Sequence, residues 1–203
     1  MTKNSGKRIV IFGGAFNPPH LGHVSVIRSV LKKFPCDEIW VMPSADRHDK
    51  AMSVSGQHRF KMVEILIKEL FQDAKVPIKI PTLELDRPKL TTTYETKTEL
   101  ENQYPDFEFY FVVGSDSFND IKTKWVNGEK LYKEANFIVL VRPGISLPEN
   151  LPKNVMVLER NLDPSNFSST DVRSLIASGK PVSQYLSKGV SEYIKENNLY
   201  KVV

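Results

Sequence analysis

One cysteine, Cys36, is all that this chain of 203 residues contains. A single thiol cannot form an internal disulfide or a cysteine-rich zinc site, so we expect a protein of the reducing cytoplasm. No purely apolar run is longer than five residues, the length of the run at 137–141, whereas a membrane-spanning helix needs roughly 20. Only a short apolar run follows the N-terminal segment MTKNSGKR, so we expect no export signal. These shortages exclude disulfide-stabilised and membrane-embedded classes.

The chain also has only a small excess of positive charge, with a formal net charge of +4. No Lys/Arg cluster alternates with aromatic residues, so we expect anionic small molecules rather than nucleic acid as partners. Hydrophobic residues make up 40% and charged residues 26%, which is typical of a chain that buries a core. The length fits a single domain, residues 1–203, in which we expect residues 1–8 to be flexible. Whether it acts as a monomer or a homo-oligomer stays open.

Runs of apolar residues alternate with segments of helical periodicity. The runs predict strands at residues 9–12, 38–42, 107–113, 137–141 and 155–158, with a further extended segment at 78–85. Apolar stripes and capping residues predict helices at 22–34, 55–71, 92–101, 168–177 and 187–197. This order predicts an α/β fold: a Rossmann-like parallel sheet with helices on both faces and a small helical C-terminal part from about residue 165. Ligands of such sheets bind outside the carboxyl ends of the strands.

The first polar motif, GGAFNPPHLGH, runs from Gly13 to His23 between the first strand and the first helix. A helix N-terminus offers unpaired N–H groups and the positive end of the helix dipole, which together attract phosphate. His20 and His23 lie three residues apart, so both imidazoles can reach the same anion. The alternatives are an ordinary tight turn for the glycines and a zinc site, which lacks a third ligand.

The second polar motif, FSSTDVR, runs from Phe167 to Arg173 at another strand-to-helix junction. Its hydroxyls, backbone N–H groups and guanidinium could bind phosphoryl oxygens, although Ser-Ser-Thr-Asp is also a good ordinary N-cap. Two anion-binding helix starts on one sheet favour a polyphosphate that spans a crevice.

Two further residues offer contacts to a nucleotide. Asp116 follows Gly114 at a strand end, where its carboxylate could accept hydrogen bonds from ribose hydroxyls or cap the next helix. Trp125 has a flat π-face that could stack on a heterocycle or pack in the core.

Taken together, these motifs resemble those of the nucleotidylyltransferase superfamily, and more narrowly those of the bacterial nicotinic acid mononucleotide adenylyltransferases. The likeness covers most of the chain. Beyond the two motifs it includes Lys50, Arg59, Met62, the segment Thr91–Thr96, Gly114-Ser-Asp116, Trp125, Arg142-Pro-Gly144, Tyr193-Ile194 and Leu199-Tyr200.

The resemblance implies transfer of AMP from ATP to the phosphate of a pyridine mononucleotide, with Mg²⁺ carried in on ATP. His20, His23 and Arg173 would be the catalytic residues, and no protein-held metal is implied. The residues that would bind ATP are Gly13, Gly14, Ala15, Phe16, His20, His23, Gly114, Asp116, Ser168, Ser169, Thr170 and Arg173. Those that would bind the acceptor are Asn17, Lys50, Thr93 and Trp125.

Departures from the family pattern concern the acceptor. The family's Pro-Pro-His-Lys becomes Asp46-Arg-His-Asp-Lys50 here, and its Ser-Tyr-Thr-x-Asp-Thr becomes Thr91-Thr-Thr-Tyr-Glu-Thr96. The positive charges of the first loop favour nicotinic acid mononucleotide, unless they are only a solvated surface. The alternatives are nicotinamide mononucleotide or phosphopantetheine as acceptor, or a catalytically silent nucleotide-binding protein.

Overall fold

The computed structural model describes residues 6–45, 54–87, 91–142, 144–159 and 167–201. Its centre is a sheet of six strands in the order β3-β2-β1-β4-β5-β6, and every pairing is parallel. The strands are β1 (Arg8–Gly14), β2 (Glu38–Pro43), β3 (Ile78–Lys79), β4 (Glu108–Gly114), β5 (Asn136–Val141) and β6 (Val155–Glu159). The predicted Rossmann-like parallel sheet is confirmed.

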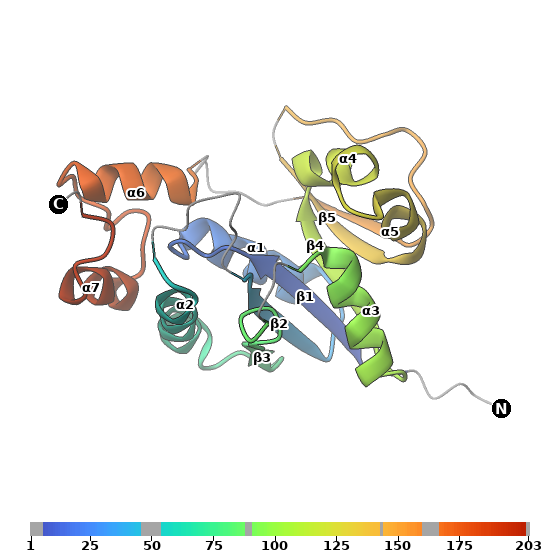
Figure 1. Cartoon of the computed structure of the whole chain (residues 1–203), viewed down its shortest axis with the longest axis horizontal. Coiled ribbons are helices and arrows are strands. Elements are labelled where there is room, and N and C mark those ends of the chain that lie inside the picture. The colour runs from blue at the N-terminus through green and yellow to red at the C-terminus, as the bar shows by residue number, and fades with distance from the viewer. Residues whose placement is uncertain (1–5, 46–53, 88–90, 143, 160–166, 202–203) are drawn as a thin grey trace.

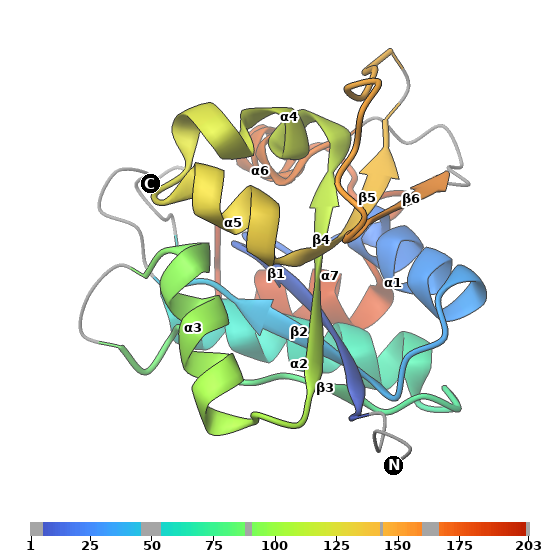
Figure 2. The same cartoon turned by 90° about the vertical axis from the view of Figure 1, so that its right-hand side faces the viewer.

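Helices cover both faces of this sheet. They are α1 (Leu21–Lys33), α2 (Gly56–Phe71), α3 (Thr93–Gln103), α4 (Ser115–Lys124), α5 (Gly128–Glu134), α6 (Ser169–Ala177) and α7 (Lys188–Glu196). In Figure 1, α1, α2, α6 and α7 lie to one side of the strands and α3, α4 and α5 to the other. Figure 2 shows the second group in front of the sheet, with α1, α2 and α7 behind it.

Two hydrophobic cores result, one on each face. Along β1, Val10 belongs to the core with α1 and α2, whereas Ile9 and Ile11 belong to the core with α4 and α5. All three side chains are at most 2% exposed. Strands buried on both faces are apolar at every position rather than at every second one, which is why they were evident as continuous apolar runs.

Most element boundaries agree with the sequence patterns, and several predicted caps are present. Ser55, Thr92, Ser168 and Ser187 each accept a backbone hydrogen bond at the start of α2, α3, α6 and α7. The extended segment at 78–85 was wrong beyond residue 79, because residues 83–86 form a turn. Helices α4 and α5 were not predicted, since each is short and follows a strand or turn directly.

The expected flexibility of residues 1–8 is wrong for its last part. Arg8 lies in β1, and the Lys7 ammonium is 3.0 Å from the Glu38 carboxylate. Residues 1–5 lie outside the described part of the chain. Within the described part, no helix is long and apolar enough to cross a membrane.

The strand order reverses between β1 and β4, which are neighbours in the sheet although far apart in sequence. In open α/β sheets this reversal opens a crevice at the carboxyl ends of the strands. The carboxyl end of β1 is Gly14 and that of β4 is Gly114. The loop that begins at Gly13 and the segment Gly114-Ser-Asp116 therefore lie at the place where such folds bind nucleotides.

Candidate active site

The two histidines of the first motif form the capping box at the start of α1. His20 is the N-cap of α1, and its Nδ1 accepts a hydrogen bond from the Gly22 backbone N at 3.1 Å. The His23 Nδ1 accepts one from the His20 backbone N at 3.0 Å. A neutral imidazole whose Nδ1 accepts carries its proton on Nε2. Both rings are thus held in the tautomer whose Nε2–H can donate to a phosphate oxygen.

Aromatic packing fixes the planes of these rings. The ring centroids of His20 and His23 are 3.8 Å apart, and His20 is only 7% exposed. The ring centroids of Phe16 and His23 are 4.9 Å apart, and those of Phe167, from the second motif, and His20 are 5.0 Å apart. Phe16 is only 2% exposed, so its ring supports His23 from inside the protein.

The second motif lies against the first, as the polyphosphate interpretation requires. Ser169 Oγ donates to the Pro18 carbonyl at 2.9 Å, and Arg173 Nη1 donates to the Asn17 carbonyl at 2.8 Å. These contacts join residues more than 150 positions apart in the sequence. They bring the candidate triphosphate-binding residues Ser169, Thr170 and Arg173 to the histidine loop.

Ser168 also has the ordinary role that the sequence left open. Its hydroxyl accepts from the Asp171 backbone N at 3.3 Å, and its backbone N donates to the Asp171 carboxylate at 2.7 Å, so the two residues form a capping box. The hydrogen bonds from the Ser168 side chain and backbone lower the pKa of Asp171. In this structure the Thr170 hydroxyl accepts from Arg173 Nη2 at 3.1 Å.

The end of β4 brings a carboxylate to the crevice through a close backbone approach. A Cβ at Gly114 would lie 2.5 Å from the Asp116 Oδ1, so a side chain at this position would displace the Asp116 carboxylate. Asp116 Oδ2 is 3.2 Å from Arg142 Nη1. Its Oδ1 is buried and has no hydrogen-bond partner among the described residues. A buried acceptor without a partner is a suitable place for a ribose hydroxyl.

The candidate acceptor residues lie in three places. Asn17 lies in the loop after β1 and is only 5% exposed. Thr93 is the first residue of α3, directly after the N-cap Thr92. Trp125 is the C-cap of α4, and its partly buried side chain packs against the core with α4 and α5, while its stacking role stays a prediction. Lys50 and the altered loop 46–50 lie outside the described residues.

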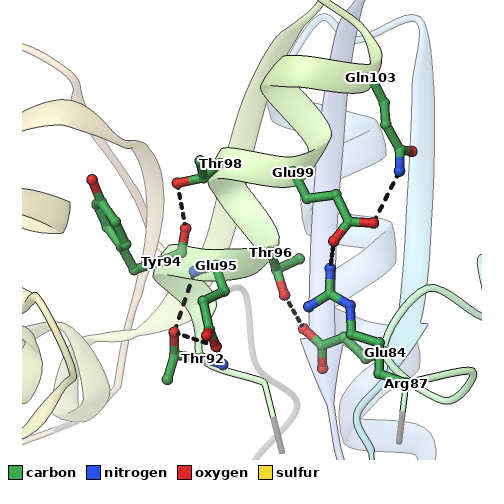
Figure 3. Close-up of polar contacts among 9 residues, drawn as sticks. All are labelled: Glu84, Arg87, Thr92, Tyr94, Glu95, Thr96, Thr98, Glu99 and Gln103. Carbon is green, nitrogen blue, oxygen red and sulfur yellow. Dashed lines mark hydrogen bonds and ion pairs between the residues drawn. The ribbon is translucent and has the colours of Figure 1, made fainter. Parts of the chain in front are cut away.

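A set of polar contacts, shown in Figure 3, holds α3 in place. Thr96 Oγ1 donates to Glu84 Oε1 at 2.8 Å, and Arg87 pairs with Glu99. Glu84 and Arg87 come from the turn that precedes α3 (Figure 3). Burial raises the pKa of Glu84, although the hydrogen bond from Thr96 and the charge of Arg87 oppose this shift.

Sequence reasoning missed the residues that support the site from outside it. Arg59 was noted only for its place in the family pattern, yet it is 0% exposed. Its Nη1 donates to the Ala15 carbonyl and its Nη2 to the Ser44 carbonyl, both at 2.7 Å. This guanidinium joins the loops after β1 and β2. An arginine on an amphipathic helix gives no sign in the sequence of such burial.

The described residues contain no group of three or more His, Cys, Asp or Glu side chains placed to hold a metal ion. The histidine pair also has both Nδ1 atoms engaged by backbone N–H groups. Beside the pair, the described residues thus offer no third ligand of the kind that a zinc site needs.

Comparison with known proteins defines first a class and then a narrower group. The cytidylyltransferase-like family model matches residues 11–175, and the chain belongs to this family. A protein of Bacillus licheniformis named "Probable nicotinate-nucleotide adenylyltransferase" is 34% identical over 96% of this chain and 99% of its own length. A protein of the same name from Shouchella clausii is 33% identical over 96% of this chain and 97% of its own length. The chain is thus similar to nicotinate-nucleotide adenylyltransferases along nearly its whole length.

Solved structures lead to the same group. The Plasmodium falciparum nicotinic acid mononucleotide adenylyltransferase complexed with NaAD matches with a TM-score of 0.84 and 28% identity. The match covers 96% of this chain and 97% of that one. The same enzyme complexed with APC matches with a TM-score of 0.82. The likeness that the motifs indicated is confirmed at the level of the family and of the fold.

Proposed function

We propose that this protein transfers AMP from ATP to nicotinic acid mononucleotide and releases pyrophosphate, giving deamido-NAD. The observation that carries the proposal is the histidine pair, with both Nδ1 atoms bound to backbone N–H groups beside the Ser169–Arg173 segment. The names of the relatives supply the identity of the acceptor.

The chemistry needs no general base. The second pKa of the acceptor's phosphate is about 6, so this group is already a dianion at neutral pH. One of its oxygens attacks the α-phosphorus of ATP in line, and the bond from that phosphorus to the bridging oxygen of the pyrophosphate breaks. Catalysis therefore consists of positioning and charge stabilisation.

Each part of the site has a task in this scheme. We assign the Nε2–H of His23 to the α-phosphate and that of His20 to the neighbouring triphosphate oxygens. Arg173, with the hydroxyls of Ser169 and Thr170, would exchange its present partners for the β- and γ-phosphates. Asp116 would accept from a ribose hydroxyl, and Thr93 and Trp125 would contact the acceptor.

Mg²⁺ is proposed to enter with ATP. When bound, it would neutralise charge that develops on the phosphate oxygens. The absence of a carboxylate cluster among the described residues suits a cation held mainly by phosphates and water.

Pyrophosphate release with ATP and a panel of acceptors tests the proposal. We expect turnover with nicotinic acid mononucleotide, weaker turnover with nicotinamide mononucleotide and none with phosphopantetheine. The dinucleotide product is identified by mass spectrometry. ATP binding with no release from any acceptor would refute the proposal in favour of a catalytically silent nucleotide-binding protein.

A further inference from the structure

The turn that leads into the histidines and the first residue of α1 are attached to the C-terminal part of the chain by four hydrogen bonds. They are Tyr200 Oη to Asn17 Oδ1 at 2.8 Å, Arg173 Nη1 to Asn17 O at 2.8 Å, Ser169 Oγ to Pro18 O at 2.9 Å and Leu21 N to Tyr185 O at 2.8 Å. Two of them hold the backbone of the turn, and the bond at Leu21 holds the start of α1. The bond from Tyr200 is the one that holds a side chain, the amide of Asn17.

Asn17 and Tyr200 are both firmly placed. Asn17 is 5% exposed, and Tyr200 packs against the core that also contains Leu199. The backbone is left-handed at Tyr200, with φ of 64°, and at Phe16, the neighbour of Asn17, with φ of 47°. Bulky residues rarely adopt this conformation, and where they do the surrounding contacts hold them in it, often at functional sites.

The Tyr200 hydroxyl lies in an electropositive setting. Burial raises the pKa of Tyr200 above its ordinary value, and the charges of Arg173 and Arg59 oppose that shift only in part. The phenol therefore keeps its proton at neutral pH and remains a hydrogen-bond donor to Asn17. Arg59 also holds Ala15, so the loop is supported on both sides of Phe16.

We propose that Tyr200 is a positioning residue of the AMP transfer: by holding the Asn17 amide, it fixes the turn that places His20 and His23. The inference rests on the proposed function, because the histidines act on phosphates only in that reaction. In this scheme Tyr200 has no contact with a substrate of its own. Its influence passes through the side chain of Asn17 to a turn that ends two residues before His20.

A single-atom change tests the proposal. Tyr200→Phe removes only the hydroxyl, and we expect kcat to fall about tenfold with the KM for ATP changed less than about threefold, because in-line geometry is more sensitive than ground-state binding. The matched control is Tyr193→Phe, which removes a hydroxyl 2.9 Å from His58 Nδ1 in the same C-terminal part. The control should retain the kcat of the unmodified protein. An unchanged kcat in Tyr200→Phe, or an equal loss in the control, would overturn the assignment.

A double-mutant cycle separates positioning from general support of the fold. If Tyr200 acts through Asn17, the change Tyr200→Phe should lower kcat by less than about twofold in an Asn17→Ala background. Independent effects would instead multiply to the full tenfold loss, and that result would refute a route through the Asn17 amide.

Hydrogen–deuterium exchange gives a readout that does not depend on activity. Tyr200→Phe should speed exchange of amides at residues 16–23 about threefold or more while leaving β4 and β5 unchanged, whereas Tyr193→Phe should leave residues 16–23 as they are. Unchanged exchange in Tyr200→Phe would overturn the inference about Tyr200. If the unmodified protein releases no pyrophosphate, the proposed function fails, and the exchange result still decides whether Tyr200 holds the turn.

Discussion

The loop from Gly13 to His23 contains the candidate phosphate-binding residues and the first turn of α3 contains the candidate acceptor residue Thr93, and the two are held in different ways. The loop contains the buried residues Asn17 and His20 and is bonded to segments more than 150 residues away. Helix α3 is polar, and its side chains Thr96 and Glu99 bond to Glu84 and Arg87 in the segment that precedes it in the chain (Figure 3). We call these two regions the phosphate end and the acceptor end of the site.

The difference follows from what each end has to do under the proposed function. The phosphate end must place donors around a reacting phosphorus, where an error of about 1 Å can cost a hundredfold in rate. The acceptor end must only select and orient a ring and its substituent. A change at α3 can therefore alter the choice of acceptor with little effect on the cores, whereas a change in the loop disturbs contacts across the molecule.

The largest effect should come from the phosphate end. His23→Ala should lower kcat by about a hundredfold or more, the scale for the loss of one preorganised donor, while the KM for ATP changes less. His58→Ala, on α2 and bonded to Tyr193, is the control for losing an imidazole elsewhere. Steady-state kinetics with thermal melts distinguish the two, and near-normal turnover of His23→Ala would remove this residue from the mechanism.

A charge-conserving change at the same end should cost somewhat less. Arg173→Lys keeps the positive charge but loses the paired donors of the guanidinium, so ATP and pyrophosphate should each bind more weakly by roughly 1.5–3 kcal/mol. AMP has neither the β- nor the γ-phosphate and serves as the control in calorimetry. If AMP binding weakens as much as ATP binding, Arg173 supports the loop through Asn17 rather than holding the terminal phosphates.

Selectivity tests the acceptor end. We expect kcat/KM for nicotinic acid mononucleotide to exceed that for nicotinamide mononucleotide by at least about tenfold, or roughly 1.4 kcal/mol, because donors built for a carboxylate stay unpaired with an amide. Trp125→Ala should weaken both acceptors alike, since stacking does not depend on the ring substituent. Kinetics with both acceptors measure this, and a preference for the amide would refute the acid-specific interpretation while the AMP transfer still stands.

The attachment of α3 should matter for the acceptor alone. Thr96→Val removes the donor to Glu84, and we expect the acceptor KM to rise about threefold to tenfold, the range for one hydrogen bond, with the KM for ATP unchanged. Thr96→Ser retains the hydroxyl and should keep both KM values at those of the unmodified protein. A rise in the KM for ATP in Thr96→Val would show that the two ends are not independent.

The smallest effect concerns pH and stability. Burial raises the pKa of Glu84 above its unfolded value, so its contribution to stability is present below an unfolded pKa of about 4.5 and is lost as pH rises through the folded value. Glu84→Gln can still accept from Thr96 and has no proton to lose. The difference between the melting temperature of Glu84→Gln and that of the unmodified protein should therefore rise in favour of the variant from pH 4 to pH 8. A constant difference across this range would contradict the shift.

The opposite sign is expected for Glu38, the first residue of β2. Burial alone would raise the pKa of Glu38, but hydrogen bonds from Lys79, Trp40 and Lys7 outweigh it and lower the pKa to about 2. The stability from Glu38 is thus present above about pH 4.5 and is lost as the pH falls towards 2. Glu38→Gln should lower the melting temperature at pH 7 more than at pH 2.5, without an effect on kinetics.

Local patterns in the sequence were enough for the sheet, most helices and the phosphate motifs. In β5 every residue after Asn136 is apolar, and capping residues such as Ser168 act within three residues of their own position, so both are visible without the fold. His20 and His23 were visible for the same reason, because a spacing of three places two side chains in one helical turn.

Contacts between distant segments were decided only by the tertiary structure. Nothing near Arg59 in the sequence indicates that its guanidinium is buried against the Ala15 and Ser44 carbonyls. The same holds for the bond from Tyr200 to Asn17 across 183 positions, and for the histidine tautomers, which depend on cap geometry. The local sequence determines which side chains lie on one strand or on one helical turn. Which groups meet across the crevice depends on how the whole sheet and its helices pack, and the sequence carries that information only collectively.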